Sequence, residues 1–139
     1  MKTKIVALDA YGTTLASDDF DNEMPARKGL EKFAKICNEN NIKILSTSDA
    51  PLITLKLDYE AAGIDWYNFF YDMYQLDMYP KYYGGIICSY DIKPAELFVI
   101  GDNYDKDLSD AKEMGCSILL VPEYLSDSDN FDFARIKIP

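Results

Sequence analysis

Short apolar runs alternate along this chain with segments of helical periodicity. The first run, Ile5–Leu8, ends at Asp9, and similar runs cover Ile42–Leu45, Leu97–Ile100 and Ser117–Val121. Apolar runs of this length are typical of parallel strands that are covered on both faces. Alternation of such strands with helices predicts an α/β fold of three layers, joined by right-handed crossovers. We therefore expect a mostly parallel sheet of about five strands.

The segments between the runs carry the expected helices. Pro25 precedes a stretch from Ala26 to about Asn40 with apolar residues at helical spacing. Further elements are expected at 51–62 (a helix capped by Ser48 or Asp49), 73–76 (a strand), 82–90 (a short helix) and before Gly115 (a helix). Residues 131–138 form either an edge strand or a segment that wraps the surface. We expect one domain over residues 1–139.

Charge and composition exclude several classes of function. The formal net charge is −10, which disfavours binding to a nucleic-acid backbone or an anionic membrane surface. The chain contains no histidine, so acid–base chemistry falls to carboxylates, lysines, hydroxyls and phenols. Cys37, Cys88 and Cys116 lie among apolar residues and are expected to be buried free thiols. The apolar run near the N-terminus is too short for a signal peptide or a membrane span, so we expect a cytoplasmic protein.

Residues 66–83 are crowded with aromatic side chains. One interpretation is core packing near a sheet edge, which we favour because tyrosine is common where one end of the ring is buried and the other is wet. The other is an exposed aromatic patch that contacts a second copy of the chain or covers a ligand.

Functional groups follow three of the predicted strands. Asp9, Thr47 and Asp102 come at strand ends, and Lys81 precedes the strand that leads to Asp102. The carboxyl ends of parallel strands share one edge of the sheet, where ligands bind in open α/β folds. Two facing carboxylates suit Mg²⁺, a lysine offsets charge or fixes a phosphate, and a threonine donates to a phosphoryl oxygen. This set predicts phosphoryl transfer through an aspartyl intermediate.

These motifs resemble those of the haloacid dehalogenase-like (HAD) superfamily, which are mostly phosphatases with a Rossmann-like three-layer sandwich. The family's first motif, Asp-x-Asp-Gly-Thr, is similar to 9–13. Its second motif resembles Thr47, with Ser46 as the alternative, and its third motif resembles Lys81 rather than Lys93. Its fourth motif, Gly-Asp-x-x-x-x-Asp, resembles 101–107. The resemblance extends over essentially the whole chain.

The resemblance implies a role for each matching residue. Asp9 would be the nucleophile, and Mg²⁺ would be held by Asp9, the backbone carbonyl of Tyr11 and Asp102. The phosphoryl group would be bound by Thr47, Ser48 and Lys81, with Asp107 and Asn103 in support. A plain helix N-terminal charge is an equal alternative for Asp107.

One position departs from the family pattern. The second aspartate of the first motif, which is the family's general acid/base, is replaced by Tyr11. A phenol with a pKa near 10 is a poor base at neutral pH, so Tyr11 is expected to slow turnover. Asp-x-Tyr-Gly-Thr resembles the first motif of 2-haloacid dehalogenases instead. Asp49 and Asp105 lie near the site in sequence as alternative carboxylates, and no inserted cap domain is expected.

Three hypotheses follow from these residues. The first is a capless, Mg²⁺-dependent phosphatase that acts on a small phosphoester or a phosphorylated macromolecule. The second is a non-catalytic or phospho-accepting module that keeps the fold and the metal site. The third is displacement of halide at carbon, which Tyr11 favours and the retained Asp102 disfavours.

Overall fold

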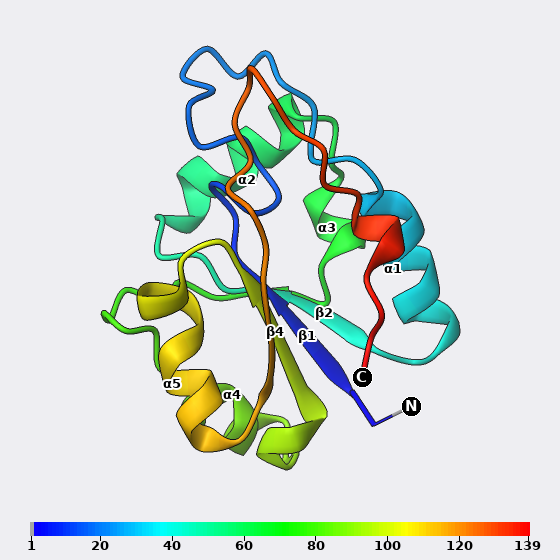
Figure 1. The fold of residues 1–139 in the computed structure, drawn as a ribbon, viewed down its shortest axis with the longest axis vertical. Helices are drawn as coiled ribbons and strands as arrows, with labels where there is room; N and C mark the ends of the chain where they lie inside the picture. The colour runs from blue at the N-terminus through cyan, green and yellow to red at the C-terminus, as the bar shows by residue number, and fades with distance from the viewer. Residues whose placement is uncertain (1) are drawn as a thin grey trace.

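The computed structural model describes residues 2–139, which form a five-stranded parallel sheet with helices on both faces (Figure 1). The strand order is β3-β2-β1-β4-β5, so the first strand of the chain lies at the centre. The strands are β1 (Ile5–Leu8), β2 (Lys43–Ser46), β3 (Asp72–Met73), β4 (Leu97–Gly101) and β5 (Ser117–Leu120). The α-helices are α1 (Leu30–Glu39), α2 (Leu52–Ala61), α3 (Trp66–Phe69), α4 (Gly84–Ser89) and α5 (Ser109–Met114). The predicted α/β fold is confirmed.

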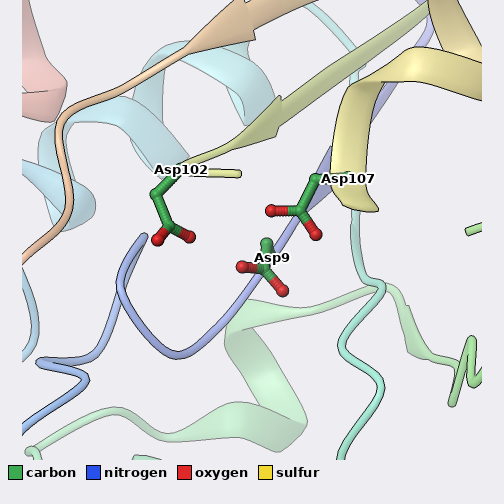
Figure 2. Close-up of side chains that lie close together, drawn as sticks. All are labelled: Asp9, Asp102 and Asp107. Carbon is green, nitrogen blue, oxygen red and sulfur yellow. The ribbon is translucent and has the colours of Figure 1, made fainter. Parts of the chain in front are cut away.

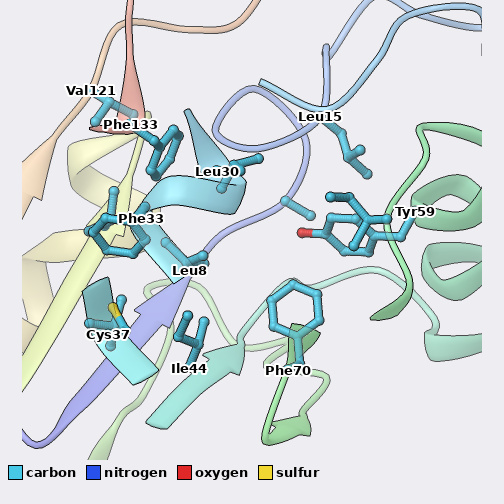
Figure 3. Close-up of a cluster of buried hydrophobic side chains, with 14 of the residues drawn as sticks. Leu8, Leu15, Leu30, Phe33, Cys37, Ile44, Tyr59, Phe70, Val121 and Phe133 are labelled. Carbon is cyan, nitrogen blue, oxygen red and sulfur yellow. The ribbon is translucent and has the colours of Figure 1, made fainter. Parts of the chain in front are cut away.

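The alternation of side chains along β1 divides the core into two layers. Val6 and Leu8 point to a layer that includes residues of α1 and α2, with Phe33 and Tyr59 among its largest side chains (Figure 3). Ile5 and Ala7 point to the opposite layer, which α4 and α5 cover. Because both faces are covered, all four residues of β1 are buried, which explains why the strand is apolar throughout.

The boundaries of two helices differ from the expectation. The helix expected from Ala26 begins at Leu30, because Gly29 adopts a left-handed conformation (φ 85°) that an α-helix does not continue through. The helix after β2 begins at Leu52 without a side-chain cap. Ser48, one of its two expected caps, accepts a hydrogen bond from the Ala50 amide instead.

The strand expected at 73–76 is found as β3 at Asp72–Met73. Its pairing with the segment after β2 continues beyond these bounds, because the amides of Tyr74 and Leu76 donate to the carbonyls of Ser46 and Ser48. The helix expected before Gly115 begins with a π-helical turn, η2 (Tyr104–Leu108), and continues as α5. Both differences lie at the edge of the sheet where the strands end.

The C-terminal residues wrap the surface, as one of the two interpretations predicted. They include the 3₁₀ turn η3 (Phe133–Arg135), whereas the other 3₁₀ turn, η1 (Pro94–Glu96), lies before β4. Phe133 is fully buried, and its ring lies 5.6 Å from that of Phe33 on α1. The C-terminal segment therefore closes the α1 side of the core.

The burial of the cysteines and of the aromatic residues differs in part from the expectation. Cys37 and Cys116 are buried free thiols, but Cys88 is exposed, because it lies on α4 away from the buried Ile86. The aromatic stretch contains both buried and exposed rings, so each of the two interpretations holds for part of it. Phe70 is in the core, whereas other rings of residues 66–83 are more than half exposed, namely Tyr67, Tyr71, Tyr79 and Tyr82.

Candidate active site

Three carboxylates meet at the carboxyl edge of the sheet (Figure 2). Asp9 directly follows β1, Asp102 directly follows β4, and Asp107 lies in η2. One oxygen from each lies within 4.8 Å of those of the other two. The register explains the meeting of the first two, because Leu8 is paired with Ile100 on the adjacent parallel strand. Asp9 and Asp107 are buried, and Asp102 is half-buried.

Lys81 provides the positive charge among these carboxylates. Its Nζ lies 2.7 Å from Asp9 Oδ1 and 2.8 Å from Asp107 Oδ1, and the side chain is fully buried. Its backbone amide donates to the carbonyl of Lys106 in η2, which holds the loop before α4 against the site. Lys93, the alternative considered from sequence, is exposed at the turn before β4. The structure therefore brings Lys81 to Asp9 and leaves Lys93 outside the site.

The pKa values of the three carboxylates are shifted in different directions. Burial would raise the pKa of Asp9, but the charge and hydrogen bond of Lys81 outweigh it, so this pKa lies below its usual range. Burial, together with the charges of Asp9 and Asp107, raises the pKa of Asp102 to about 6 against a hydrogen bond from Thr13. Burial and the charge of Asp9 also raise the pKa of Asp107 in spite of Lys81. Three carboxylates thus share the site with one buried ammonium group, and the pKa values of two of them are raised.

A tight loop after β1 brings its backbone against Asp102. Gly12 has φ 88°, and a Cβ there would collide with the Asp102 carboxylate. The hydroxyl of Thr13 lies 3.2 Å from Asp9 Oδ2 and 2.9 Å from Asp102 Oδ1, so it links the two acids. Sequence reasoning assigned no role to Thr13, although its place directly after Gly12 in the first motif was the available signal.

A buried arginine supports this loop from the other side. Arg27 is fully buried, and its guanidinium lies 2.7 Å from Asp129 and donates to the carbonyl of Thr13 at 3.2 Å. The rings of Tyr124 and Phe131 lie within 5.3 Å and 4.7 Å of the guanidinium carbon. The sequence carries no local signal for this contact, because Asp129 is about a hundred residues away along the chain.

The register and the alternation of side chains separate the two candidate hydroxyls after β2. The Thr47 amide donates to the Leu8 carbonyl, so Thr47 is level with Asp9. Thr47 shares the face of Leu45, which packs in the same layer as Ala7 and hence on the Asp9 side. Ser46 shares the opposite face with Ile44. Ser48 is buried beside them, and its hydroxyl closes the turn at Ala50.

Two supporting residues lie in the loop after β4. The Asn103 amide donates to Asp107 Oδ2 at 3.2 Å, and the Asn103 side chain accepts from the Lys106 amide at 3.1 Å. Asp107 is fully buried and paired with Lys81. This geometry disfavours the alternative that Asp107 is only an exposed charge at a helix start.

Tyr11 points to a carboxylate that sequence reasoning missed. Its hydroxyl donates a 2.5 Å hydrogen bond to Asp58 on α2. Burial, this hydrogen bond and the charge of Asp58 raise the pKa of Tyr11 above its usual value, so the phenol stays neutral. Of the carboxylates considered from sequence, Asp49 pairs with Lys106, and Asp105 is exposed. The periodicity of α2 gave no indication that Asp58 would face Tyr11.

Comparison with known proteins finds a match to a family model over part of the chain. Residues 76–131, which contain Lys81, Asp102 and Asp107, match the family model described as HAD-hydrolase-like. No curated protein matches the chain by sequence.

Solved structures resemble the chain over nearly its full length. A haloacid dehalogenase-like family hydrolase from Xanthomonas campestris has a TM-score of 0.72 at 10% identity, covering 95% of this chain and 92% of its own. A predicted phosphoglycolate phosphatase from Haemophilus somnus 129pt has a TM-score of 0.66 at 12% identity, covering 96% of each chain. A HAD-superfamily hydrolase from Ehrlichia chaffeensis has a TM-score of 0.62 at 15% identity, covering 85% of this chain and 87% of its own. The fold is therefore HAD-like.

Two further observations bear on the expectations from sequence. No large cap domain is inserted, because the chain between β1 and α1 spans only residues 9–29 and contains no helix in the structure. Across residues 2–139, no helix combines the length and the apolar character that a bilayer span needs.

Proposed function

We propose that this HAD-like hydrolase is a Mg²⁺-dependent phosphatase whose nucleophile is Asp9. The observation that carries the proposal is the contact of Lys81 with Asp9, at 2.7 Å, inside a cluster of three carboxylates at the carboxyl edge of the sheet. An ionised, directed carboxylate beside an ammonium group is the arrangement that attack on a phosphoester requires.

The donor set fits a divalent cation. Three carboxylates lie together with one ammonium group, and hard oxygen ligands of this kind suit Mg²⁺. Asp9, Asp102 and the backbone carbonyl of Tyr11 would hold the ion, and Asp107 and Asn103 would support them. When bound, Mg²⁺ supplies positive charge that stabilises the phosphoryl oxygens in the transition state.

The residues of the chain then perform a displacement in two steps. An oxygen of Asp9 attacks phosphorus, a new P–O bond forms, and the bond to the substrate alcohol breaks. Water next attacks the aspartyl-phosphate, which releases inorganic phosphate and restores Asp9. Lys81, Thr47 and Ser48 bind the phosphoryl oxygens during both steps, and Lys81 keeps Asp9 ionised.

Tyr11 limits the rate of this chemistry. Its neutral phenol is engaged with Asp58, and its raised pKa makes it a weak base towards water. Loss of general acid–base catalysis typically costs a factor of about 10² to 10⁴. The enzyme is therefore slow, and it favours leaving groups that depart without a proton.

The neutral phenol of Tyr11 also supports a second candidate function. If no group activates water, the aspartyl-phosphate on Asp9 persists, and the protein acts as a phospho-accepting module. Complete hydrolysis of the adduct within seconds would rule this out. Halide displacement has less support, because the buried carboxylate cluster suits a cation and no cap encloses a haloacid. Release of halide from 2-chloropropionate that EDTA leaves unchanged would support it.

The deciding experiment is hydrolysis of p-nitrophenyl phosphate with Mg²⁺ by the wild type and by Asp9→Asn. Activity that disappears in Asp9→Asn is the expected result. If no phosphoester in a broad panel gives turnover that depends on Asp9, the phosphatase proposal is wrong.

A further inference from the structure

An ion pair joins the loops that follow the two strands on either side of β1. Lys106 Nζ lies 3.4 Å from Asp49 Oδ2. Asp49 belongs to the loop after β2, and Lys106 belongs to η2 after β4. Because β2 and β4 flank β1 on either side, a contact between these loops passes over the end of β1, where Asp9 lies.

The backbone of Lys106 is fixed while its side chain stays accessible. The Lys106 carbonyl accepts from the Lys81 amide at 2.9 Å, and the Lys106 amide donates to Asn103. The Lys106 side chain is nevertheless 26% exposed, whereas that of Lys81 is completely buried. The two lysines therefore approach the site at different depths, with Lys106 on the solvent side.

The charge of Lys106 acts on the reacting group. After Lys81, it is a further cation whose charge lowers the pKa of Asp9. Burial lowers the pKa of Lys106 itself, but the charges of Asp9 and Asp49 outweigh this effect, so Lys106 stays protonated. Lys106 is thus a cation whose charge reaches Asp9 from outside the buried cluster.

The balance of charges in the site indicates a role for Lys106. Lys81 together with one divalent ion would neutralise the three carboxylates, so a bound phosphoester would bring further negative charge that these groups do not compensate. The partner that Lys106 has in the structure, Asp49, is 46% exposed. Exposed pairs of this kind are weak, so a substrate anion can replace Asp49 at little cost.

We propose that Lys106 binds a second anionic group on the alcohol part of the phosphoester, which takes the place of Asp49 in the ion pair across the site. This inference rests on the proposed phosphatase function and names the substrate class. The buried Lys81 would bind the phosphoryl group. The alcohol part of the substrate would extend from there towards solvent, where Lys106 lies. The substrate is therefore a phosphoester whose alcohol carries a carboxylate or a second phosphate.

A matched pair of substrates tests this directly. Glycerol 3-phosphate and 3-phosphoglycerate differ in a terminal hydroxymethyl group against a carboxylate. A charge-assisted contact predicts that the wild type prefers 3-phosphoglycerate in kcat/KM by about 10-fold. Lys106→Gln should abolish this preference through KM, and Asp49→Asn should increase it, because the competing carboxylate is gone. Lys112→Gln, an exposed lysine on α5, is the control and should keep the wild-type preference.

Two readouts keep the inference separate from the proposed function. The same ligands are tested for their effect on the Tm of each variant, which requires no turnover. A phosphatase that depends on Asp9 but whose preference is unchanged in Lys106→Gln would overturn the inference alone. A protein without turnover, in which 3-phosphoglycerate still raises the Tm in a manner that depends on Lys106, would overturn the phosphatase proposal and support the inference.

Discussion

The phenol of Tyr11 donates a 2.5 Å hydrogen bond to Asp58 on α2. The position that carries the general acid/base in HAD phosphatases, as the motif resemblance implies, is thus occupied by a neutral group held by a neighbouring carboxylate. Asp58 comes from a different element, so the phenol and its acceptor meet only in the folded chain. With this arrangement, Asp9 could still form the proposed aspartyl-phosphate. Tyr11, however, would not transfer protons to or from the reacting oxygens.

Replacing Tyr11 by aspartate should accelerate hydrolysis of phosphoesters with poor leaving groups. A carboxylic acid at this position can protonate the departing alcohol and then accept a proton from water, which is worth about 10² or more. The measurement is kcat for alkyl and aryl phosphates of increasing leaving-group pKa, and the slope of this dependence should flatten in Tyr11→Asp. Tyr67→Asp, at an exposed tyrosine, is the matched control. An unchanged slope would show that position 11 takes no part in proton transfer.

Replacing Lys81 by methionine should abolish activity and destabilise the fold. Removing one partner of a buried ion pair leaves buried charge uncompensated, at a cost of about 3–5 kcal/mol. Chemical denaturation measures the free energy of unfolding, and added Mg²⁺ should restore part of the loss by compensating the carboxylates. Lys93→Met removes an exposed lysine before β4 and should change both quantities little. Equal effects of the two substitutions would contradict the position of Lys81 in the site.

Mg²⁺ affinity should fall as the pH drops through about 6. Burial raises the pKa of Asp102 to about 6, so this proposed ligand is ionised above that pH and protonated below it. Since the folded-state pKa lies above the ordinary value, protonation of Asp102 stabilises the metal-free fold as the pH falls, and ionisation at higher pH opposes it. The stabilisation by Mg²⁺ should therefore be large at pH 8 and small at pH 5.

Calorimetric titration with Mg²⁺ across this range measures the effect. Asp102→Asn should bind Mg²⁺ weakly at every pH. A wild-type affinity that is independent of pH between 5 and 8 would exclude Asp102 as a ligand.

Replacing Gly12 by alanine should impair both stability and metal binding. The residue has φ 88°, and the new Cβ would collide with Asp102. Gly63→Ala offers a matched control, because Gly63 has φ 87° but nothing within 4 Å of the added carbon. The strain of a left-handed conformation costs about 1–2 kcal/mol in both variants. Only Gly12→Ala should also weaken Mg²⁺ binding in a titration, and equal affinities in the two variants would contradict the collision.

The amino-acid sequence was enough to predict the architecture and the edge of the sheet at which the candidate site lies. The runs at Ile5–Leu8 and Leu97–Ile100 are apolar at every position because both faces of a parallel sheet are covered, and this local pattern needs no knowledge of distant contacts. The motif spacing also indicated Asp9, Asp102 and Lys81, and the edge of a parallel sheet explains why residues so far apart meet there.

Tertiary structure alone decided what surrounds these groups. The contacts of Tyr11 with Asp58, Arg27 with Asp129, and Lys106 with Asp49 join residues 47, 102 and 57 positions apart. The hydrophobic periodicity of a sequence shows which positions are polar. It does not show which other polar residue such a side chain contacts, because any pairing is compatible with the same periodicity. The packing of the loops and α2 around β1 therefore decides whether Tyr11 has a hydrogen-bond partner. It also decides which cation lies on the solvent side of Asp9.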